Sequence, residues 1–307
     1  MKSTVSGAIT SVWRTFDSSN NFTTIMPEPP ISIPSDSSPL LRAVRARTPA
    51  RILVGRAGPS YRTATQLELR QDHAAALDAV HAEIDMERNL GADLVRRFRL
   101  FEVRTRADSK EQYLLRPDLG RRFDDAARET IRRECPAHCV VQVAIGDGLS
   151  AAAVTAQVPG LLPLLDEDGR RRGWSFGRPF FIRHCRVGVL NDIGDILDPE
   201  VVILLIGERP GLATAESLSA YLAYRPRTGH TDAQRNLISN IHARGVGHPE
   251  AARRIMGLAE QMRRRQMSGF SVKEELLAAS LPAPPHPLPL SPEAGERGER
   301  TPPEGDT

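Results

Sequence analysis

The sequence predicts an α/β fold, namely a Rossmann-like doubly wound sheet with an additional N-terminal helical lobe and disordered tails. Segments with the continuous apolar character of buried strands alternate with segments of helical periodicity, as in a parallel sheet covered on both faces. The clearest strand is VVILLIG (201–207), which opens with six consecutive apolar residues. Both ends of the chain, in contrast, are rich in Pro and polar residues, which do not form a core.

Composition divides the chain into four segments. Residues 1–45, rich in Ser, Pro and Asn, are expected to form a flexible arm with at most a short helix at Ile9–Phe16. Residues 46–135 are expected to form the helical lobe, and residues 136–270 the Rossmann-like domain. Residues 271–307, rich in Pro, Gly and Glu, are expected to be a disordered tail.

Two strands and two helices are expected in the helical lobe. ARILVG (50–55) and LFEVRT (100–105) have the composition of short strands. Thr65 and Glu68 have the spacing of a capping box, which predicts that a helix begins there. Pro117 suits the first turn of a second helix. Four apolar residues at steps of four form the predicted buried face of that helix: Leu119, Phe123, Ala127 and Ile131.

The Rossmann-like domain is expected to open with a buried strand, CVVQVAIG (139–146), and a helix of small residues, AAAVTAQ (151–157). PFFIRHCRVGV (179–189) is expected to be another strand. VVILLIG (201–207) has the β-branched start and the sharp end of a strand that is buried on both faces. These units predict the parallel part of the sheet.

Three helices are expected after the last of these strands. The first contains Leu218 and Leu222, which lie about one helical turn apart. Thr231 and Gln234 have capping-box spacing, so a second helix is expected to begin there. Its apolar residues would be Leu237, Ile238 and Ile241. The third begins at Pro249, because proline is favoured in the first helical turn.

The composition argues against several classes of function. Of the 307 residues, 41 are basic and 38 are acidic, and the two signs alternate along helical segments such as 121–134. That pattern is typical of solvated helix faces, so no nucleic-acid partner is expected. No apolar run is long enough to cross a membrane, and no convincing signal peptide is present. The chain is therefore expected in the cytoplasm.

The cysteines and histidines do not match a metal or catalytic motif. Cys135, Cys139 and Cys185 lack the spacing of a zinc knuckle, so they are expected to be buried or half-buried free thiols in a reducing compartment. The Walker, G-x-G-x-x-G, G-x-S-x-G and H-E-x-x-H motifs are absent. His184 is expected to be a packing or surface histidine, and His242 to cap or bond the backbone. We therefore expect no catalytic residue and no metal ligand on this chain.

Ligands of open α/β sheets bind beyond the carboxyl ends of the strands. Three predicted loops occupy such positions: 147–150, the turn after 184–187, and 207–217. In the last, Gly207 and Gly211 would let the backbone approach a ligand, and the Glu208 carboxylate would accept hydrogen bonds from it. Equally, Glu208 would pair with Arg209 or another nearby arginine while the glycines only turn the chain.

Two other kinds of loop have both a structural and a functional interpretation. In DGLS (147–150), Asp147 and Ser150 are expected to cap the following helix. The arginine-bearing turns GRAGPSYRT (55–63) and RPDLGRR (116–122) are typical of interface or anion-contacting segments, and equally of solvated turns.

Several segments together identify a family. GRAGPSYRTATQLELRQDHAAALDAV, LLRPDLGRRF, IGDGLS, PFFIRHCRV, VVILLIGERPGLATAESLSAYLAY and RNLISNIHARG follow one another in this order. Residues 45–265 thereby resemble the small (light) subunit of ethanolamine ammonia-lyase, whereas both tails lie outside the resemblance. One such segment alone would be a weak signal, but the ordered set is highly specific.

The resemblance implies an ammonia-lyase that is active only with its large subunit. In this family the large subunit, a TIM barrel, recognises the substrate and carries the radical chemistry, and the small subunit closes over adenosylcobalamin at the interface. Homolysis of the cobalt–carbon bond begins the conversion of ethanolamine to acetaldehyde and ammonia. The implied partners are the large subunit, cobalamin and ethanolamine, in the cytoplasm or inside a bacterial microcompartment.

The family's cobalamin contacts on this subunit fall on three residues: Val187, Glu208 and Leu237. Val187 would meet the corrin edge, and Glu208 would accept hydrogen bonds from corrin amides. Leu237 stands where some relatives have a cysteine, so its contact would be made by the backbone or by van der Waals packing. The chain has no D-x-H-x-x-G sequence, so we expect that it supplies no axial histidine to cobalt.

Two alternatives to this interpretation are compatible with the sequence. The first is a stand-alone Rossmann-like nucleotide-binding enzyme, which would be active without a partner and would bind a plain nucleotide. The second is a scaffold or targeting protein that uses the N-terminal arm as its address. A partner-dependent lyase subunit predicts no activity from the isolated chain.

Overall fold

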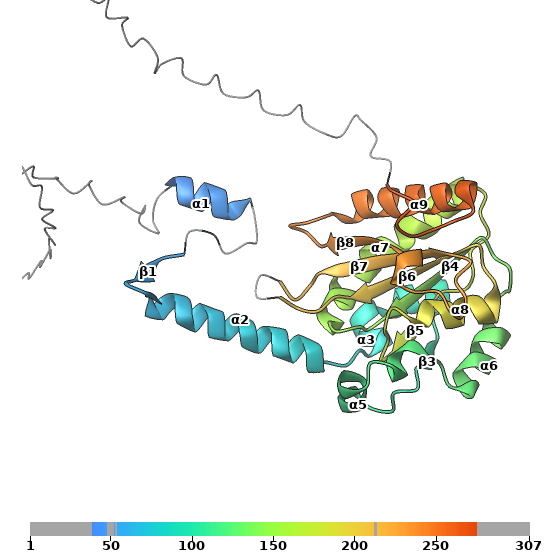
Figure 1. The fold of residues 1–307 in the computed structure, drawn as a ribbon, viewed down its shortest axis with the longest axis horizontal. Coiled ribbons are helices and arrows are strands. Elements are labelled where there is room, and N and C mark those ends of the chain that lie inside the picture. The colour runs from blue at the N-terminus through green and yellow to red at the C-terminus, as the bar shows by residue number, and fades with distance from the viewer. Residues whose placement is uncertain (1–38, 48–51, 53, 212–213, 275–307) are drawn as a thin grey trace, which may run out of the picture.

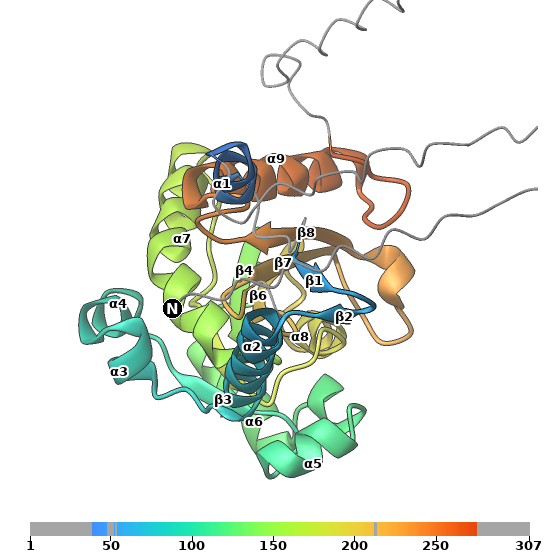
Figure 2. The same ribbon diagram turned by 90° about the vertical axis from the view of Figure 1, so that its left-hand side faces the viewer.

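The centre of the molecule is a six-stranded sheet with the order β3-β5-β4-β6-β7-β8 (Figures 1 and 2). The computed structural model describes residues 39–47, 52, 54–211 and 214–274. Strands β3, β5, β4 and β6 are parallel to one another, whereas β7 is antiparallel to both β6 and β8. The six strands are β3 (Glu102–Arg104), β4 (Val141–Gly146), β5 (Phe180–Arg183), β6 (Val201–Gly207), β7 (Leu218–Tyr224) and β8 (Asn236–Ile241). The predicted α/β class with a mostly parallel sheet is confirmed.

Helices cover the sheet, and further helices precede it at the N-terminal side of the chain. The α-helices are α1 (Pro39–Ala46), α2 (Thr63–His81), α3 (Met86–Leu90), α4 (Ala92–Phe98), α5 (Lys110–Leu115), α6 (Asp125–Glu134), α7 (Ala151–Arg171), α8 (Val189–Leu197) and α9 (His248–Arg265). Two short 3-10 helices are η1 (Leu119–Arg121) and η2 (Asp232–Gln234), and a small hairpin joins β1 (Arg56–Ala57) to β2 (Ser60–Tyr61).

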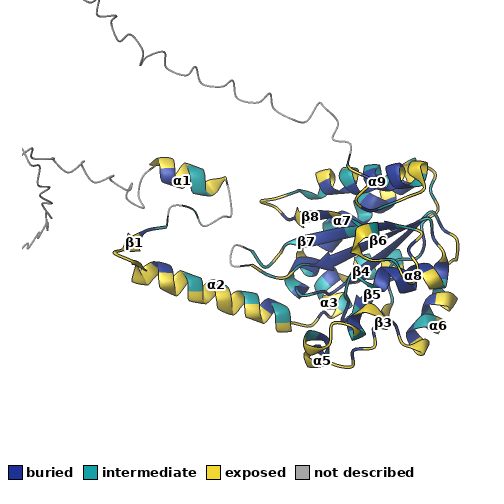
Figure 3. Ribbon diagram, in the orientation of Figure 1, coloured by how far each residue is buried: buried dark blue, intermediate teal, exposed yellow. Residues whose placement is uncertain are grey.

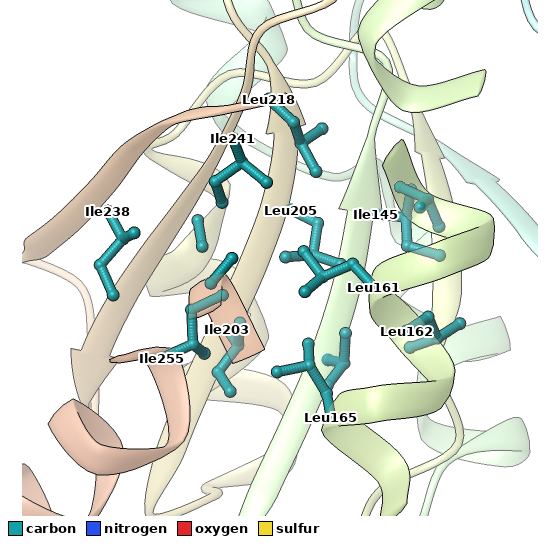
Figure 4. Close-up of a cluster of buried hydrophobic side chains, with 14 of the residues drawn as sticks. Ile145, Leu161, Leu162, Leu165, Ile203, Leu205, Leu218, Ile238, Ile241 and Ile255 are labelled. Atoms are coloured by element: carbon teal, nitrogen blue, oxygen red, sulfur yellow. The ribbon is translucent and has the colours of Figure 1, made fainter. Parts of the chain in front are cut away.

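Strands β4 and β6 form the middle of the sheet because both of their faces are covered. Every residue of both strands is buried. In β6, Ile203 and Leu205 point to the layer made by α7 and α9, where they meet Leu161 of α7 and Ile255 of α9 (Figure 4). Leu204 and its alternate neighbours pack on the opposite face, against α6 and α8. Burial stabilises each such aliphatic side chain by about 1.5–3 kcal/mol.

The two covering layers do not extend equally across the sheet. Strands β7 and β8 place Leu222 and Ile238 against α9 on one face. On the other face, α6 and α8 pack over β3, β5, β4 and β6, and the core there includes no residue of β8. Leu237 of β8 accordingly remains 46% exposed. The β7–β8 half of that face is therefore less covered than the rest of the sheet.

The helix expected at Leu218 and Leu222 is wrong, since this segment is strand β7. A spacing of four residues places side chains on one side of a helix and also, being even, on one face of a strand. Leu218 and Leu222 lie on the face that packs against α9, and β7 pairs along its whole length with β6. The backbone hydrogen bonds between β7 and β6 therefore determine that this segment is a strand.

The helix expected from Thr231 is wrong in the same way. Thr231 and Gln234 do form a capping box, but it opens only the 3-10 turn η2. The chain then enters strand β8, in which Leu237 and Ile238 point to opposite faces. The local capping signal is correct, and the pairing of β8 with β7 prevents the helix from continuing.

Three expected element boundaries also differ. The strand expected at 179–189 ends at Arg183, because His184 adopts a left-handed conformation with φ 58°, and helix α8 follows. Helix α2 begins at Thr63 without a side-chain cap, so the predicted Thr65 box is wrong. The helix expected from Pro117 is split into η1 and α6, because Asp124 caps α6 by accepting a hydrogen bond from Ala127 N at 2.7 Å.

The other predicted elements are confirmed or partly lie outside the described residues. The segments at 100–105, 139–146 and 201–207 contain β3, β4 and β6. Helix α7 begins where predicted but continues through Pro159 and Pro163, and α9 begins at His248 with proline in its first turn. Of the strand expected at 50–55, the described residues 52, 54 and 55 are not in a strand.

The segment expected to be a helical lobe is not uniform. Helix α2 projects from the body and is largely exposed (Figures 1 and 3). In contrast, β3 pairs with β5, and α6 packs on the sheet. Residues 1–38 and 275–307, with the helix expected at Ile9–Phe16, lie outside the described residues. Within the part that is described, no helix combines the length and the apolar character that crossing a membrane requires.

Candidate functional site

Three loops meet beyond the carboxyl ends of β4, β5 and β6, as the sequence predicted. They follow Gly146, Arg183 and Gly207. Together they line a small cavity of 140 Å³. Its wall is formed by Tyr113, Gly148, Leu149, Cys185, Arg186, Val187, Ile206, Gly207, Glu208, Arg209 and Tyr221. Two of the three residues predicted to contact cobalamin, Val187 and Glu208, are therefore in one cavity.

Asp147 holds the loop after β5 in place. Its carboxylate accepts hydrogen bonds from the backbone N–H groups of His184 at 2.9 Å and Cys185 at 2.8 Å, and it lies 4.0 Å from Lys110 Nζ. Burial raises the pKa of this carboxyl, and burial lowers the pKa of Lys110. The expectation that Asp147 caps a helix is wrong, whereas Ser150 does cap α7 by accepting a bond from Ala153 N at 3.1 Å.

Further contacts position the segment that contains Val187. Tyr113 donates a hydrogen bond from its hydroxyl to Cys185 O at 2.9 Å, and the Arg186 guanidinium lies 4.2 Å from the centre of the Tyr113 ring. Arg186 N donates to Gly120 O at 2.8 Å. A Cβ atom at Gly120 would lie 2.7 Å from Arg186 Cγ, so the close approach requires glycine. This network places Val187 at the cavity.

Glu208 begins the hairpin between β6 and β7, which is anchored to the start of α7. Ser150 Oγ donates to Ala215 O at 2.5 Å, and Gln157 Nε2 donates to Glu216 O at 3.1 Å. A Cβ atom at Gly207 would lie 2.1 Å from Ser150 O, so this glycine permits close packing with α7. Among the described residues Glu208 forms no ion pair, so the alternative of a pair with Arg209 is not observed.

Tyr221 is a site residue that the sequence analysis missed. It lies on β7 directly opposite Leu237 of β8, which places both side chains on the less covered face of the sheet. Its hydroxyl lies 3.5 Å from Glu208 Oε1. Burial, and then the Glu208 carboxylate, raises the pKa of Tyr221 to about 12, so the phenol remains a donor at neutral pH. The misassigned helix at 218–222 hid this residue.

A second, larger cavity of 490 Å³ adjoins the first, and Arg186, Val187 and Tyr221 line both. Its other lining residues are Pro117, Arg121, Arg122, Gly188, Asn191, His230, Thr231, Asp232 and Arg235. The predicted arginine-bearing turn at 116–122 therefore borders this cavity. Leu237 lines neither cavity, and its connection to them is through Tyr221.

The cysteines and His242 have the buried or hydrogen-bonded environments that the sequence predicted. Cys135, Cys139 and Cys185 are free and buried, as expected. Burial raises the pKa of Cys135 to about 12 and that of Cys139 to about 11. His242 bonds Asn240 Oδ1 at 2.7 Å and accepts from Arg244 N at 3.2 Å, as its predicted backbone role requires.

The fold and these cavities define a class of protein, an α/β chain with cavities beyond the ends of its parallel strands, where ligands of such sheets bind. Comparison with known proteins gives the family. A profile described as ethanolamine ammonia-lyase light chain (EutC) matches residues 39–273. The chain belongs to this family, and the resemblance identified from the sequence is confirmed.

Curated relatives agree with this assignment and carry the name ethanolamine ammonia-lyase small subunit. A protein of Clostridium perfringens is 40% identical over 240 residues, or 78% of this chain and 79% of its own length. One from Listeria monocytogenes is 41% identical over 240 residues, covering 78% and 80%. One from Fusobacterium nucleatum is 42% identical over 229 residues, covering 75% and 76%.

Proposed function

We propose that this chain is the small subunit of an adenosylcobalamin-dependent ethanolamine ammonia-lyase, active together with a large subunit. Its role in this proposal is to hold the cofactor at the interface between the two chains. The observation that carries the proposal is the convergence of Val187 and Glu208, from two separate loops, in one cavity. The family membership and the names of the relatives support the reaction and the existence of a partner.

The residues at the two cavities have the chemistry that a corrinoid requires. A corrin has an apolar ring edge and a periphery of amide side chains. Val187 and the ring of Tyr221 offer apolar surface, and the Glu208 carboxylate accepts hydrogen bonds from amide N–H groups. Three residues that line the larger cavity also carry a buried nitrogen without a partner: Arg186 Nε, His230 Nδ1 and Arg235 Nε. The combined lining therefore fits a large ligand with many polar groups.

Each residue then has a defined part in binding. Glu208 would accept hydrogen bonds from the corrin amides, and the protonated Tyr221 would orient its carboxylate. Val187 would pack on the corrin edge, and Leu237 would be covered when the partner docks on the β7–β8 face. When bound, adenosylcobalamin supplies the radical chemistry, and this chain binds, orients and shields it from water.

The first experiment tests the partner and the cofactor together. The chain is co-expressed with its large subunit, and the purified complex is assayed for acetaldehyde with and without adenosylcobalamin. We expect activity only from the complex and only with the cofactor. Turnover by the isolated chain, or binding of a plain nucleotide by it, would instead favour the stand-alone enzyme. A complex that is active without cobalamin would also contradict the proposal.

A second experiment tests Glu208 directly. Glu208→Gln removes the charge but keeps the size, so adenosylcobalamin should bind the complex about 1–3 kcal/mol more weakly, the range for hydrogen bonds to charged groups. The affinity is measured by titrating the cofactor and following its absorption. Glu167→Gln, an exposed glutamate on α7, is the matched control and should not change the affinity. Equal affinities for all three proteins, with normal melting temperatures, would remove Glu208 from the site.

A further inference from the structure

The larger cavity is rich in arginine. Its walls come from three segments that are distant in the sequence: the turn around η1, the start of α8, and the connection between β7 and β8. Four arginines line it, namely Arg121, Arg122, Arg186 and Arg235, against a single lining carboxylate, Asp232. An excess of positive charge in a cavity favours an anionic ligand.

Two of the four guanidinium groups are neutralised by the protein itself. Arg122 forms an ion pair with the buried Asp192 at 2.8 Å, and Arg235 forms one with Asp232. Arg121 and Arg186, in contrast, have no carboxylate partner within the described part of the chain. The stem of Arg121 packs over Gly188, where a Cβ atom would lie 2.9 Å from Arg121 Cγ. Two positive charges at the cavity therefore remain uncompensated.

Three of the residues that line the cavity also carry a buried side-chain nitrogen without a partner. Arg186 Nε, His230 Nδ1 and Arg235 Nε are buried without a hydrogen-bond partner. Each such group costs about 1–3 kcal/mol unless something else bonds to it. The Arg235 side chain is only 7% exposed, and burial lowers the pKa of its guanidinium. A bound anion would relieve both costs.

The walls of the cavity are held in place before any ligand arrives. Asn191 of α8 donates to His230 O at 2.8 Å and accepts from Arg235 Nη2 at 3.3 Å. Asp195 accepts hydrogen bonds from the backbone N and the hydroxyl of Thr228, at 3.1 and 2.5 Å. These bonds fasten the β7–β8 connection to α8, so the donors of the cavity are preorganised.

We infer that the larger cavity is a phosphate-binding subsite, in which Arg121, Arg186 and Arg235 bond the oxygens of a phosphate group. Donors from three separate segments suit a tetrahedral anion with several oxygens better than a carboxylate with two. Guanidinium groups bind phosphate with paired, charge-assisted hydrogen bonds. The phosphate has two potential sources: the phosphodiester in the nucleotide loop of cobalamin, which rests on the proposed function, and free phosphate.

The test uses the complex with the large subunit and the variant Arg121→Gln, because Arg121 is exposed and forms no ion pair that folding would lose. Inorganic phosphate is titrated calorimetrically into the cofactor-free complex. We expect the variant to bind phosphate roughly 10- to 100-fold more weakly, the effect of one charged hydrogen-bonding group. Arg171→Gln, on the opposite side of the sheet at the end of α7, is the control and should bind phosphate normally.

A second arm distinguishes the two sources. Adenosylcobinamide has the corrin ring but lacks the phosphate, ribose and base of the nucleotide loop. If the cofactor supplies the phosphate, Arg121→Gln weakens adenosylcobalamin about 10- to 100-fold and leaves adenosylcobinamide nearly unchanged. If only the phosphate titration changes, the site takes free phosphate. Arg121→Lys, which keeps the charge, should recover part of the affinity in either case.

Two results separate this inference from the proposed function. Phosphate and adenosylcobalamin affinities that are both unchanged in Arg121→Gln would overturn the phosphate subsite and leave the lyase proposal intact. A complex that binds neither corrinoid would contradict the proposed function, whereas the phosphate titration would still decide the nature of the cavity.

Discussion

Tyr221 illustrates how one side chain links the parts of this site. It borders both cavities, its hydroxyl faces Glu208, and its strand position is opposite Leu237. The phenol is partly buried beside a carboxylate, and both conditions disfavour its ionisation. The hydroxyl therefore stays protonated and can donate to Glu208 over the whole physiological range.

The raised pKa of Tyr221 predicts a specific loss of stability in alkali. Because the pKa rises from 10.0 to about 12 on folding, the contribution of this group is fully present below pH 10 and is lost as the pH rises through 12. Partial exposure reduces the effect to about 1 kcal/mol. Between pH 9 and pH 12, the free energy of unfolding of Tyr221→Phe should therefore fall by about 1 kcal/mol less than that of the wild type. Urea denaturation at each pH measures both values.

Tyr61→Phe is the control for this prediction, because that phenol lies on β2 and is 41% exposed. If the wild type, Tyr221→Phe and Tyr61→Phe lose stability equally in alkali, Tyr221 is not shielded in the folded protein. The carboxylate of Glu208 would then lack its ordered donor.

At the scale of elements, the pairing of β7 and β8 with the sheet determines which side chains reach the site. As a strand, β8 directs Ile238 into the core against α9 and Leu237 to the opposite face. A helix in the same place would have put these two neighbours on adjoining parts of one surface. The strand therefore leaves Leu237 exposed, where the proposed cofactor and partner could contact it.

This alternation predicts opposite effects for two adjacent substitutions. Ile238→Ala should lower the free energy of unfolding by about 2–5 kcal/mol, because Ile238 is only 1% exposed and its truncation leaves a cavity in the core. Leu237→Ala should change stability much less, by about 0.5 kcal/mol, since nearly half of this residue is exposed to solvent. Chemical denaturation of both variants measures the difference. Similar losses for the two would contradict the strand assignment.

Helix α7 is an element that tertiary packing maintains although its local sequence disfavours a helix. Pro159 and Pro163 lie inside it, and an interior proline ordinarily costs a helix about 3 kcal/mol. Leu161, Leu162 and Leu165, on the turns around the prolines, are buried against the sheet (Figure 4). Their burial offsets the cost, so the helix reaches Arg171.

At the scale of the whole molecule, the layers account for an unequal surface. Helices cover both faces of β5, β4 and β6, whereas β7 and β8 are covered mainly by α9 (Figures 1 and 2). The two cavities open beside the less covered half. Helix α2 projects on its own with Leu67 and Leu77 exposed (Figure 3). Such surfaces are typical of a chain that works within a larger assembly.

The sequence by itself determined the central strands, the loops that follow them, and the family. Largely apolar runs such as those of β4 and β6 are typical of strands that a parallel sheet buries on both faces. Glu208 was predictable for the same reason, since it lies just beyond a predicted strand, whereas Val187 lay inside the strand predicted at 179–189 and came from the family resemblance. The ordered set of family segments then identified the chain without any structure.

Only the tertiary structure decided between helix and strand for the elements whose apolar spacing fits both. Leu218 and Leu222 suit a helix and a strand equally, and the hydrogen bonds of β7 to β6 settle the matter. The role of Asp147 likewise depends on backbone N–H groups that lie 37 and 38 residues away along the chain. The arginine cavity combines three distant segments, so its charge balance exists only after folding has brought them together.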